Sequence, residues 1–480
     1  MKKALLLTVA VTLMLLCAAG AQAADLTARG YWWMEAVNKG GWDFLKDGED
    51  NRFTIEEKLR TAFYFTANEN LRGVLDTQIG SQPWGVGIYQ IGSGRNPAAG
   101  AGSANTNGGS IMLRKGYIEY KVPGTLINTS VGFQTVTLPA AFGGGNPIFD
   151  DQVAAAVVSA PLTKNISLTA GYARPMQGTD SPDSSSAFDV VFASLPITGN
   201  GINFSPFVAY GYGGAGSGAA TTAGLSNNAT SARTGVRAYW GGAALTVKPD
   251  MPLVFMADVN YGSATYNNDP SLNSNKGGRS GYMLDFAVDY TGLNWVTPQF
   301  FATYSSGESS GNNATDGKSN RMPVIGLPQN WTIGSFFFGE RLELAGSINT
   351  TAGYTRNTLG YWATGISLKN ITLLDKLSQD FNLLYARGTN SPDTIRNYNS
   401  IGALKSWGGY LTSNDSLVEV DLNSRYKLYD ELTAYVYLGY IFANFDKDLW
   451  GNSAMSQAGI LRQGGTSNAY KIGVGLNYFF

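Results

Sequence analysis

The chain has 480 residues, of which 34 are basic, 35 are acidic and none is histidine, so its formal charge is −1. Charged residues make up 14% of the sequence, against about 25% in an average soluble domain, while glycine reaches 60 residues and aromatic residues 12%. The charge balance argues against a nucleic-acid partner, and the missing histidine excludes the Ser-His-Asp form of catalysis and the commonest zinc ligand.

The first 23 residues are typical of a cleavable secretory signal peptide. Two lysines precede an apolar run that ends at Leu16, and small residues up to Ala23 fit a cleavage site. We expect residues 24–480 to form the mature protein, with a charge of 32 − 35 = −3. Cys17 is the only cysteine and would leave with the signal, so neither a disulfide nor a thiolate metal site is expected. No lipid anchor is expected either, because Leu16 stands where a lipoprotein signal needs a small residue.

The mature chain repeats segments of roughly ten or more residues in which apolar and polar side chains alternate, bounded by turn residues. The last segment is an example, because apolar residues occupy every second position from Tyr470 to Phe480. Aromatic residues lie near the segment ends, as they do at the two interfaces of a membrane. In chain order, strands are predicted at 26–37, 53–67, 71–79, 111–122, 127–138, 151–162, 165–174, 186–196, 202–213, 233–247, 252–265, 279–291, 295–306, 358–370, 378–389, 415–428, 431–444 and 467–480.

Short links alternate with long ones along this series. The long connections fall near 80–110, 214–232, 307–357, 390–414 and 445–466. This alternation predicts an all-β fold: a single transmembrane antiparallel β-barrel of about 18 strands, with 16 as the alternative, with short periplasmic turns and long extracellular loops. Segment 307–357 either folds over the mouth or hides one more hairpin. A soluble β-sandwich is the disfavoured alternative, because the signal peptide commits the chain to export.

Charged residues on the early strands share one face, which must be the lumen because a charge facing lipid is costly. The predicted pore wall consists of Glu56, Lys58, Arg60, Arg72, Asp76, Lys115 and Glu119. The other charges assigned to the lumen by alternation are Arg237, Arg425, Lys427, Lys471, Asp189, Asp258, Asp285, Asp289, Glu419 and Asp421. Since the two signs are nearly balanced, weak overall ion selectivity is expected.

The stretch 25–176 resembles the homotrimeric outer-membrane porins of sulfate-reducing bacteria. The resemblance is carried by the opening Leu26-Thr27-Ala28-Arg29-Gly30, a charge-rich strand at 53–67 and the run Asn146-Pro147-Ile148-Phe149-Asp150-Asp151, and later strands extend it over nearly the whole mature chain. It implies a homotrimer of channels in the outer membrane of a Gram-negative bacterium. It also implies that the loop after the fifth strand folds inward.

That loop, at 139–152, contains the predicted pore constriction. Asp150 and Asp151 are expected to face the basic wall, because opposed fixed charges are how a pore selects ions and orients dipolar solutes. The alternative is that both aspartates are solvated or cap the loop. Calcium bound by loop carboxylates stays open, and no other metal or cofactor is expected.

Two charges break the alternation. Glu57 and Arg114 have outward parity and are predicted to pair at the trimer interface, unless a β-bulge reverses their orientation. At the other end of the chain, Tyr478 and Phe480 resemble the C-terminal signal read by the barrel-insertion machinery during assembly.

These features are compatible with three functions, of which the third is disfavoured. The first is a non-enzymatic, water-filled channel in contact with the lipid bilayer, for passive diffusion of small hydrophilic solutes and ions. The second is a channel selective for carboxylates or sugars, with lumen aromatics such as Tyr435 and Tyr437 contributing binding sites. The third, an outer-membrane enzyme, is disfavoured because histidine is absent and no other catalytic signature is visible.

Overall fold

In the computed structural model, the residues described are 24–41, 52–85, 111–177, 187–214, 235–266, 278–308, 318–325, 332–334, 360–393, 411–450 and 467–480. The predicted signal peptide, 1–23, lies outside these ranges. Across the described part of the chain, no helix is both long enough and apolar enough to cross a membrane.

Strands dominate the described part. They are β1 (Asp25–Gly40), β2 (Arg52–Asn68), β3 (Leu71–Pro83), β4 (Met112–Lys121), β5 (Asn128–Thr137), β6 (Asp150–Pro161), β7 (Ser167–Gln177), β8 (Ala187–Ser194), β9 (Ile197–Gly199), β10 (Ile202–Gly213), β11 (Val236–Val247), β12 (Leu253–Tyr266), β13 (Gly278–Tyr290), β14 (Thr297–Ser305), β15 (Lys318–Ser319), β16 (Tyr361–Leu374), β17 (Leu377–Gly388), β18 (Ser416–Lys427), β19 (Leu432–Asn444) and β20 (Ala469–Phe479), with the short helix α4 (Lys447–Trp450).

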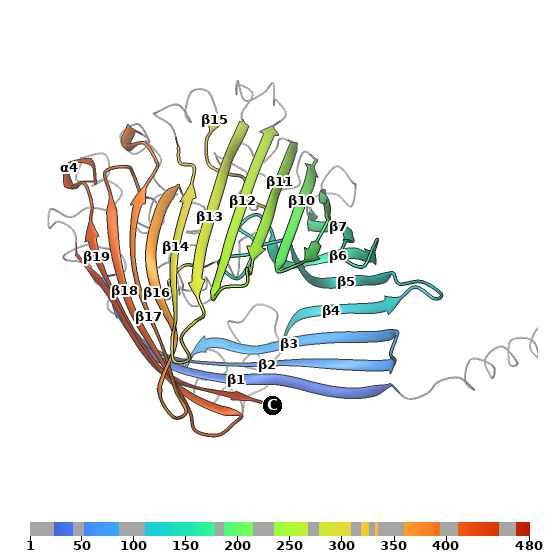
Figure 1. Cartoon of the computed structure of the whole chain (residues 1–480), viewed down its shortest axis with the longest axis horizontal. Helices are drawn as coiled ribbons and strands as arrows, with labels where there is room; N and C mark the ends of the chain where they lie inside the picture. The colour runs from blue at the N-terminus through green and yellow to red at the C-terminus, as the bar shows by residue number, and fades with distance from the viewer. Residues whose placement is uncertain are drawn as a thin grey trace, which may run out of the picture.

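Eighteen of these strands form a closed antiparallel barrel. The three residues of β9 continue β8 along β10, and the two residues of β15 pair with β13. Apart from these two pieces, each strand pairs with the next one along the chain. β1 also pairs with β20, which closes the ring, and the C-terminal end lies beside β1 in Figure 1. The predicted fold class and strand number are confirmed, because each predicted strand overlaps one strand of the barrel.

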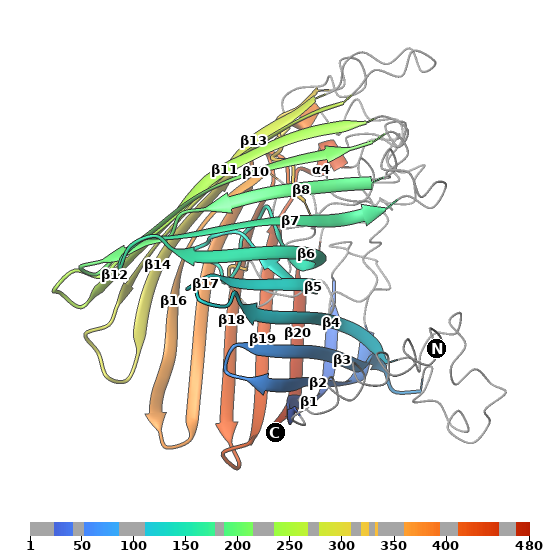
Figure 2. The same cartoon turned by 90° about the vertical axis from the view of Figure 1, so that its right-hand side faces the viewer.

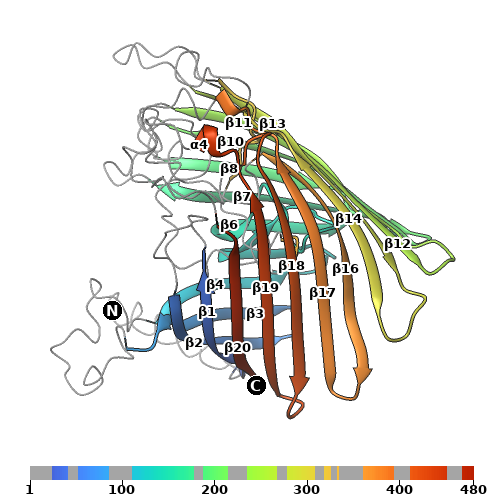
Figure 3. The same ribbon diagram turned by 90° about the vertical axis from the view of Figure 1, so that its left-hand side faces the viewer.

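The barrel has two different ends. Figure 2 shows β1 to β8 side by side in chain order, and Figure 3 shows β16 to β20 with their turns and the C-terminus at one end. Short connections such as 69–70 and 375–376 lie at that end, which we call the short-turn end. Connections such as 214–235 and 389–415 join the strands at the opposite, long-loop end.

The outer surface of the barrel is apolar. Side chains at every second position of the strands are exposed there, and they include Trp32, Phe65, Ile118, Val131, Val158, Val208, Val259, Ile366, Val436 and Ile472. In a closed barrel all strand edges are paired, so such a surface is suited to contact with lipid hydrocarbon.

The inner face of the wall from β6 to β11 is apolar as well. Its buried residues include Val153, Ala173, Phe188, Val190, Phe192, Phe207, Ala238 and Trp240. They belong to one core cluster with Phe142, Ile148, Phe149, Met322, Val324 and Ile325, which come from segments folded into the barrel. Burying a large apolar side chain contributes about 1.5–3 kcal/mol. The interior beside these strands is therefore a packed core, and the polar lining lies on the other walls.

Apolar packing on the inside corrects two sequence-based assignments. Alternation predicts that Asp189 and Arg237 face the lumen, but their neighbours Phe188, Val190 and Ala238 are buried on the inner face. Arg237 is exposed and shares the outward parity of Tyr239, which is 56% exposed. The rule that the more apolar face meets lipid fails here because both faces of this wall are apolar.

Candidate channel constriction

The loop between β5 and β6 crosses the lumen, as predicted, and is held by β12. The backbone N–H groups of Ala141 and Phe142 each donate to a carboxylate oxygen of Asp258, both at 2.8 Å. Asp258 is 3% exposed and lies on the inner face of β12. Since β5 and β12 are far apart around the barrel, these contacts require the loop to span the interior.

A second set of contacts fixes the shape of the loop. The Asn146 side-chain amide donates to the carbonyl of Pro139 at 2.7 Å and to the Asn260 side chain of β12 at 3.2 Å. The Phe142 ring stacks on Phe301 of β14 at a centroid distance of 5.8 Å. Gly143, with φ of 77°, lies at the bend in a conformation that favours glycine.

Segment 307–357 also enters the barrel, in the parts that are described. Trp240 donates from its indole N–H to the carbonyl of Pro323 at 2.9 Å, and the N–H of Ile325 donates to the carbonyl of Ile148 at 2.8 Å. The N–H of Thr332 donates to the carbonyl of Gly143 at 2.9 Å. Of the two predicted alternatives, these contacts correspond to inward folding onto the constriction loop; residues 309–317, 326–331 and 335–357 lie outside the described part.

A cavity of about 510 Å³ lies beside the constriction loop. Polar side chains on β14, β16 and β17 line it, including Gln299, Ser367 and Asn382. Lys369 also lines it and forms an ion pair with Asp289 at 2.8 Å. The loop therefore leaves polar space along this wall.

The predicted acidic pair lies at the start of β6. Asp150 pairs with Thr137 across the β5–β6 ladder, and its carboxylate accepts a hydrogen bond from the Thr137 hydroxyl group at 2.7 Å. Asp151 accepts one from the N–H of Gln152 at 2.7 Å. These contacts hold the end of the loop. The carboxylate that holds the part crossing the lumen is that of Asp258, whose role sequence reasoning missed.

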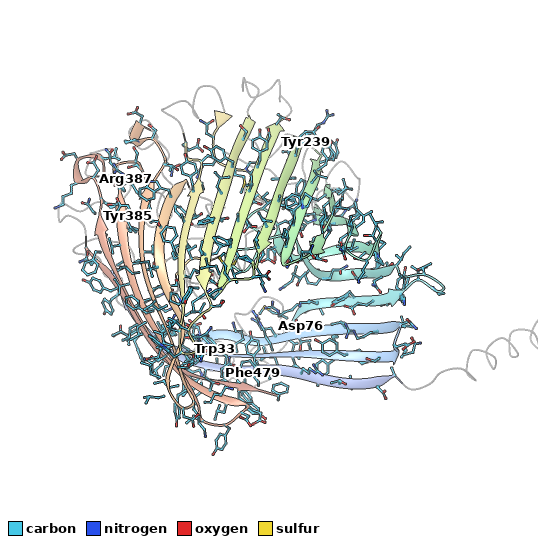
Figure 4. All side chains as sticks on the ribbon, in the orientation of Figure 1. Trp33, Asp76, Tyr239, Tyr385, Arg387 and Phe479 are labelled. Carbon is cyan, nitrogen blue, oxygen red and sulfur yellow. The ribbon has the colours of Figure 1, made fainter. Side chains whose placement is uncertain are left out.

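Basic and aromatic side chains alternate on the inner faces of β1 and β2. Lys58 Nζ lies 5.0 Å from the Trp33 ring centroid, and the Arg60 guanidinium lies 5.8 Å from that of Tyr31. The β1–β2 register pairs the same residues across the ladder. Cation–π attraction of about 0.5–2 kcal/mol holds each charge against the wall. Figure 4 labels Trp33 on β1.

Two acidic wall residues lie close to this basic array. Glu56 pairs in register with Glu35, which is buried on β1. Glu35 accepts hydrogen bonds from the hydroxyl groups of Tyr437 and Tyr435, the latter at 3.1 Å. Both tyrosines therefore face the lumen, as predicted, and their rings are stacked with centroids 6.0 Å apart.

Arg114 does not face outward. Its Nε lies 4.0 Å from Asp76, and Lys115 Nζ lies 3.7 Å from the same carboxylate, so two consecutive residues of β4 reach one group. The β3–β4 register shifts between Asp76 and Thr77, which is the β-bulge alternative. Arg114 also donates to Gln78 at 3.0 Å, as does Arg60 at 2.6 Å. The predicted outward parity of Arg114 is therefore wrong.

The remaining wall pair lies near the short-turn end. Arg72 donates from Nε to Glu119 at 3.0 Å and forms an ion pair with it, with side chains 44% and 34% exposed. Both residues line a cavity of about 490 Å³ beside the 69–70 turn. They are thus separated along the barrel axis from Lys58 and the constriction loop.

Glu57 faces outward, as its parity predicts. Both of its carboxylate oxygens accept indole N–H donors, from Trp32 at 2.7 Å and from Trp84 at 3.1 Å. The two tryptophans thus give each carboxylate oxygen of Glu57 a hydrogen-bond donor from the same chain.

The C-terminal residues close the barrel. Gly30 and Phe480 exchange two backbone hydrogen bonds, of 2.9 and 3.1 Å. Tyr478 is paired in register with Trp32, and its ring lies 6.0 Å from that of Phe480. Their predicted role as an assembly signal is not tested by these contacts.

No protein-family model and no curated protein matches the sequence. Solved structures of similar fold include three from Pseudomonas aeruginosa. OpdL has a TM-score of 0.51 at 11% identity, covering 95% of this chain and 99% of that one. OpdQ has a TM-score of 0.50 at 10% identity, covering 95% and 98%. The outer membrane protein OprD has a TM-score of 0.50 at 12% identity, covering 96% of each chain. The chain therefore shares the fold of these proteins along nearly its whole length.

Proposed function

We propose that this chain is an outer-membrane porin of a Gram-negative bacterium, through which small hydrophilic solutes and ions diffuse passively. The observation that carries the proposal is the constriction loop, which Asp258 holds across a closed barrel while polar space remains beside it. Removal of residues 1–23, insertion by the barrel-assembly machinery and assembly as a homotrimer belong to the same proposal. The residues described at the constriction bind and orient solutes, and we assign no catalytic role to them.

The charges along the passage favour broad rather than ion-exclusive permeation. Lys58 and Arg60 line one wall, while Asp289 is neutralised by Lys369 on another. Because basic and acidic groups lie together on both walls, with Glu35 and Glu56 close to the first pair, their charges partly cancel and net selectivity stays small.

Reversal potentials in planar bilayers test this assignment. We expect Lys58→Gln combined with Arg60→Gln to shift selectivity toward cations, and Asp150→Asn combined with Asp151→Asn to shift it toward anions. Arg72→Gln is the matched control, because its ion pair with Glu119 lies away from the constriction. Unchanged selectivity in both double variants would place the narrow part of the pore elsewhere, and absence of any conductance in the unaltered protein would contradict the porin itself.

A channel selective for carboxylates is the second candidate, and the basic array favours it. Lys58 and Arg60 lie over aromatic faces, which fixes two cationic side chains side by side on the inner wall, where an anionic solute would be attracted. Flux of succinate that saturates with concentration and falls in the Lys58→Gln variant would favour this candidate over free diffusion. Saturation by a neutral sugar alone would favour the sugar-selective alternative.

A further inference from the structure

A row of polar side chains crosses the outer face of the barrel near the long-loop end. In register, Asp189 of β8 lies beside Tyr212 of β10, which lies beside Arg237 of β11, followed by Thr265 of β12. Arg174 of β7 joins the row through Asp189. All five residues have outward parity on a surface that is otherwise apolar, so the row requires a physical explanation.

Arg174 is held in a fixed orientation within this row. Its Nε and Nη2 atoms donate to the two carboxylate oxygens of Asp189 at 2.7 and 3.1 Å, and Nη1 donates to Gln177 at 3.2 Å. The Tyr172 hydroxyl donates to Asp189 at 2.6 Å. A guanidinium group has five N–H donors, so two remain for another acceptor. The Arg174 side chain is 40% exposed, which leaves its free edge accessible.

The register shift in β7 explains why Arg174 lies opposite Asp189. The β7–β8 ladder is interrupted between Ala173 and Met176, and Pro175, which has no N–H to donate, lies within the interruption. A bulge re-aims the side chains beside it.

Arg237 provides a second cationic group in the row. It is exposed, and within the described part of the chain no ion pair joins its guanidinium to a carboxylate. Together Arg174, Asp189 and Arg237 carry a net charge of +1. The row therefore attracts anions although one of its members is acidic.

The row lies directly beyond a band of aromatic residues. Tyr210 and Tyr239 lie two positions from Tyr212 and Arg237 along their strands, on the side away from the long-loop end, and their ring centroids are 5.0 Å apart. Val208, which is 62% exposed, lies two positions further along β10. Figure 4 shows Tyr239 near the long-loop end of β11. Tyrosine prefers the boundary between hydrocarbon and headgroups, so a polar row just beyond it lies at headgroup depth.

We propose that this row, consisting of Arg174, Asp189, Tyr212 and Arg237, binds the phosphate of a lipid headgroup in the outer leaflet. The proposal rests on the outer-membrane location given under the proposed function. Guanidinium groups recognise phosphate oxygens through parallel N–H donors, and Asp189 orients one of the two guanidiniums. The apolar band below the row would hold the acyl chains of the same lipid, which makes a lipid rather than free phosphate the ligand.

Binding of phosphorylated lipid A to the full mature protein in detergent tests the proposal. Arg174→Gln combined with Arg237→Gln should weaken affinity by about tenfold or more, since hydrogen bonds to charged groups are the strong ones. Arg237→Gln alone should weaken the affinity for lipid A in part. This substitution preserves every described side-chain contact. Arg174→Lys combined with Arg237→Lys should recover part of the affinity. The matched control is Arg425→Gln, which removes a lumen-facing guanidinium ion-paired with Asp380 at 2.5 Å.

Three outcomes would overturn the proposal: unchanged affinity in both the double variant and Arg237→Gln, equal binding of dephosphorylated lipid A, or full competition by inorganic phosphate at matched concentration. Conductance is measured on the same samples. Lost lipid binding with normal conductance supports the lipid site, and lipid binding without any conductance would contradict the porin while leaving the site in place.

Discussion

Asp258 is the residue on which the position of the constriction loop depends most directly. It accepts two backbone N–H donors from the loop while almost completely buried. Hydrogen bonds to a charged acceptor contribute about 1.5–3 kcal/mol each, so losing both should favour the released loop by about a hundredfold or more. We expect Asp258→Ala to raise single-channel conductance and current noise.

The controls for this variant separate loop release from loss of charge. Asp258→Asn keeps one acceptor oxygen and should give an intermediate effect. Asp250→Asn removes an exposed carboxylate in the turn before β12, and its conductance should equal that of the unaltered protein. If Asp258→Ala conducts like the unaltered protein, Asn260 and Phe301 hold the loop without it.

Strands β2 and β4 differ in how they orient their irregular charges, and this difference revises the expected trimer contact. Glu57 on β2 faces outward between two tryptophans, whereas the bulge in β4 turns Arg114 toward Asp76. Glu57→Lys removes the carboxylate that accepts both indole N–H groups and replaces it with a cation that faces outward. Placing a charged side chain against hydrocarbon costs several kcal/mol. If this face lies in the proposed trimer, native gels should show weaker trimers.

Arg114→Glu should not restore those trimers, because Arg114 contacts lumen residues within its own chain. Glu57→Gln keeps one acceptor oxygen for the tryptophans and should keep the trimer. Recovery of trimers in the Glu57→Lys, Arg114→Glu double variant would mean that the two residues meet between subunits.

Closure of the barrel depends on the seam between β1 and β20, where the first and last strands meet. Deleting Phe480 removes both hydrogen bonds to Gly30 and the ring beside Tyr478. We expect less of the shortened protein in the outer membrane. We also expect its folded barrel to unfold at a lower temperature, which is measured as the temperature at which its mobility in a gel changes. Phe480→Tyr keeps the backbone bonds and an aromatic ring, so it should assemble normally. Normal yield and mobility of the deleted form would rule out a role of Phe480 in closure and assembly.

The alternation of side chains in the sequence predicts the strands and much of the lumen wall. Each side chain of a barrel strand points either toward lipid or toward the lumen, so its neighbours indicate which of the two it faces. This reasoning predicts that Lys58, Arg60 and Asp76 point into the barrel, since each lies on a strand whose opposite face is plainly apolar. The directions of strand side chains are local, so neighbouring residues contain the information. The inward fold of the loop at 139–152 is instead implied by the resemblance to homotrimeric porins.

Tertiary structure decides the rest. Asp189 and Arg237 face outward because segments from elsewhere in the chain fill the interior beside β8 and β11, and Arg114 faces inward because of one extra residue in a ladder. The loop is held by Asp258, which is 117 residues away from Ala141. Such contacts depend on which distant groups the closed barrel brings together, whereas the sequence alone determines that a barrel closes, because only closure pairs every strand edge in lipid.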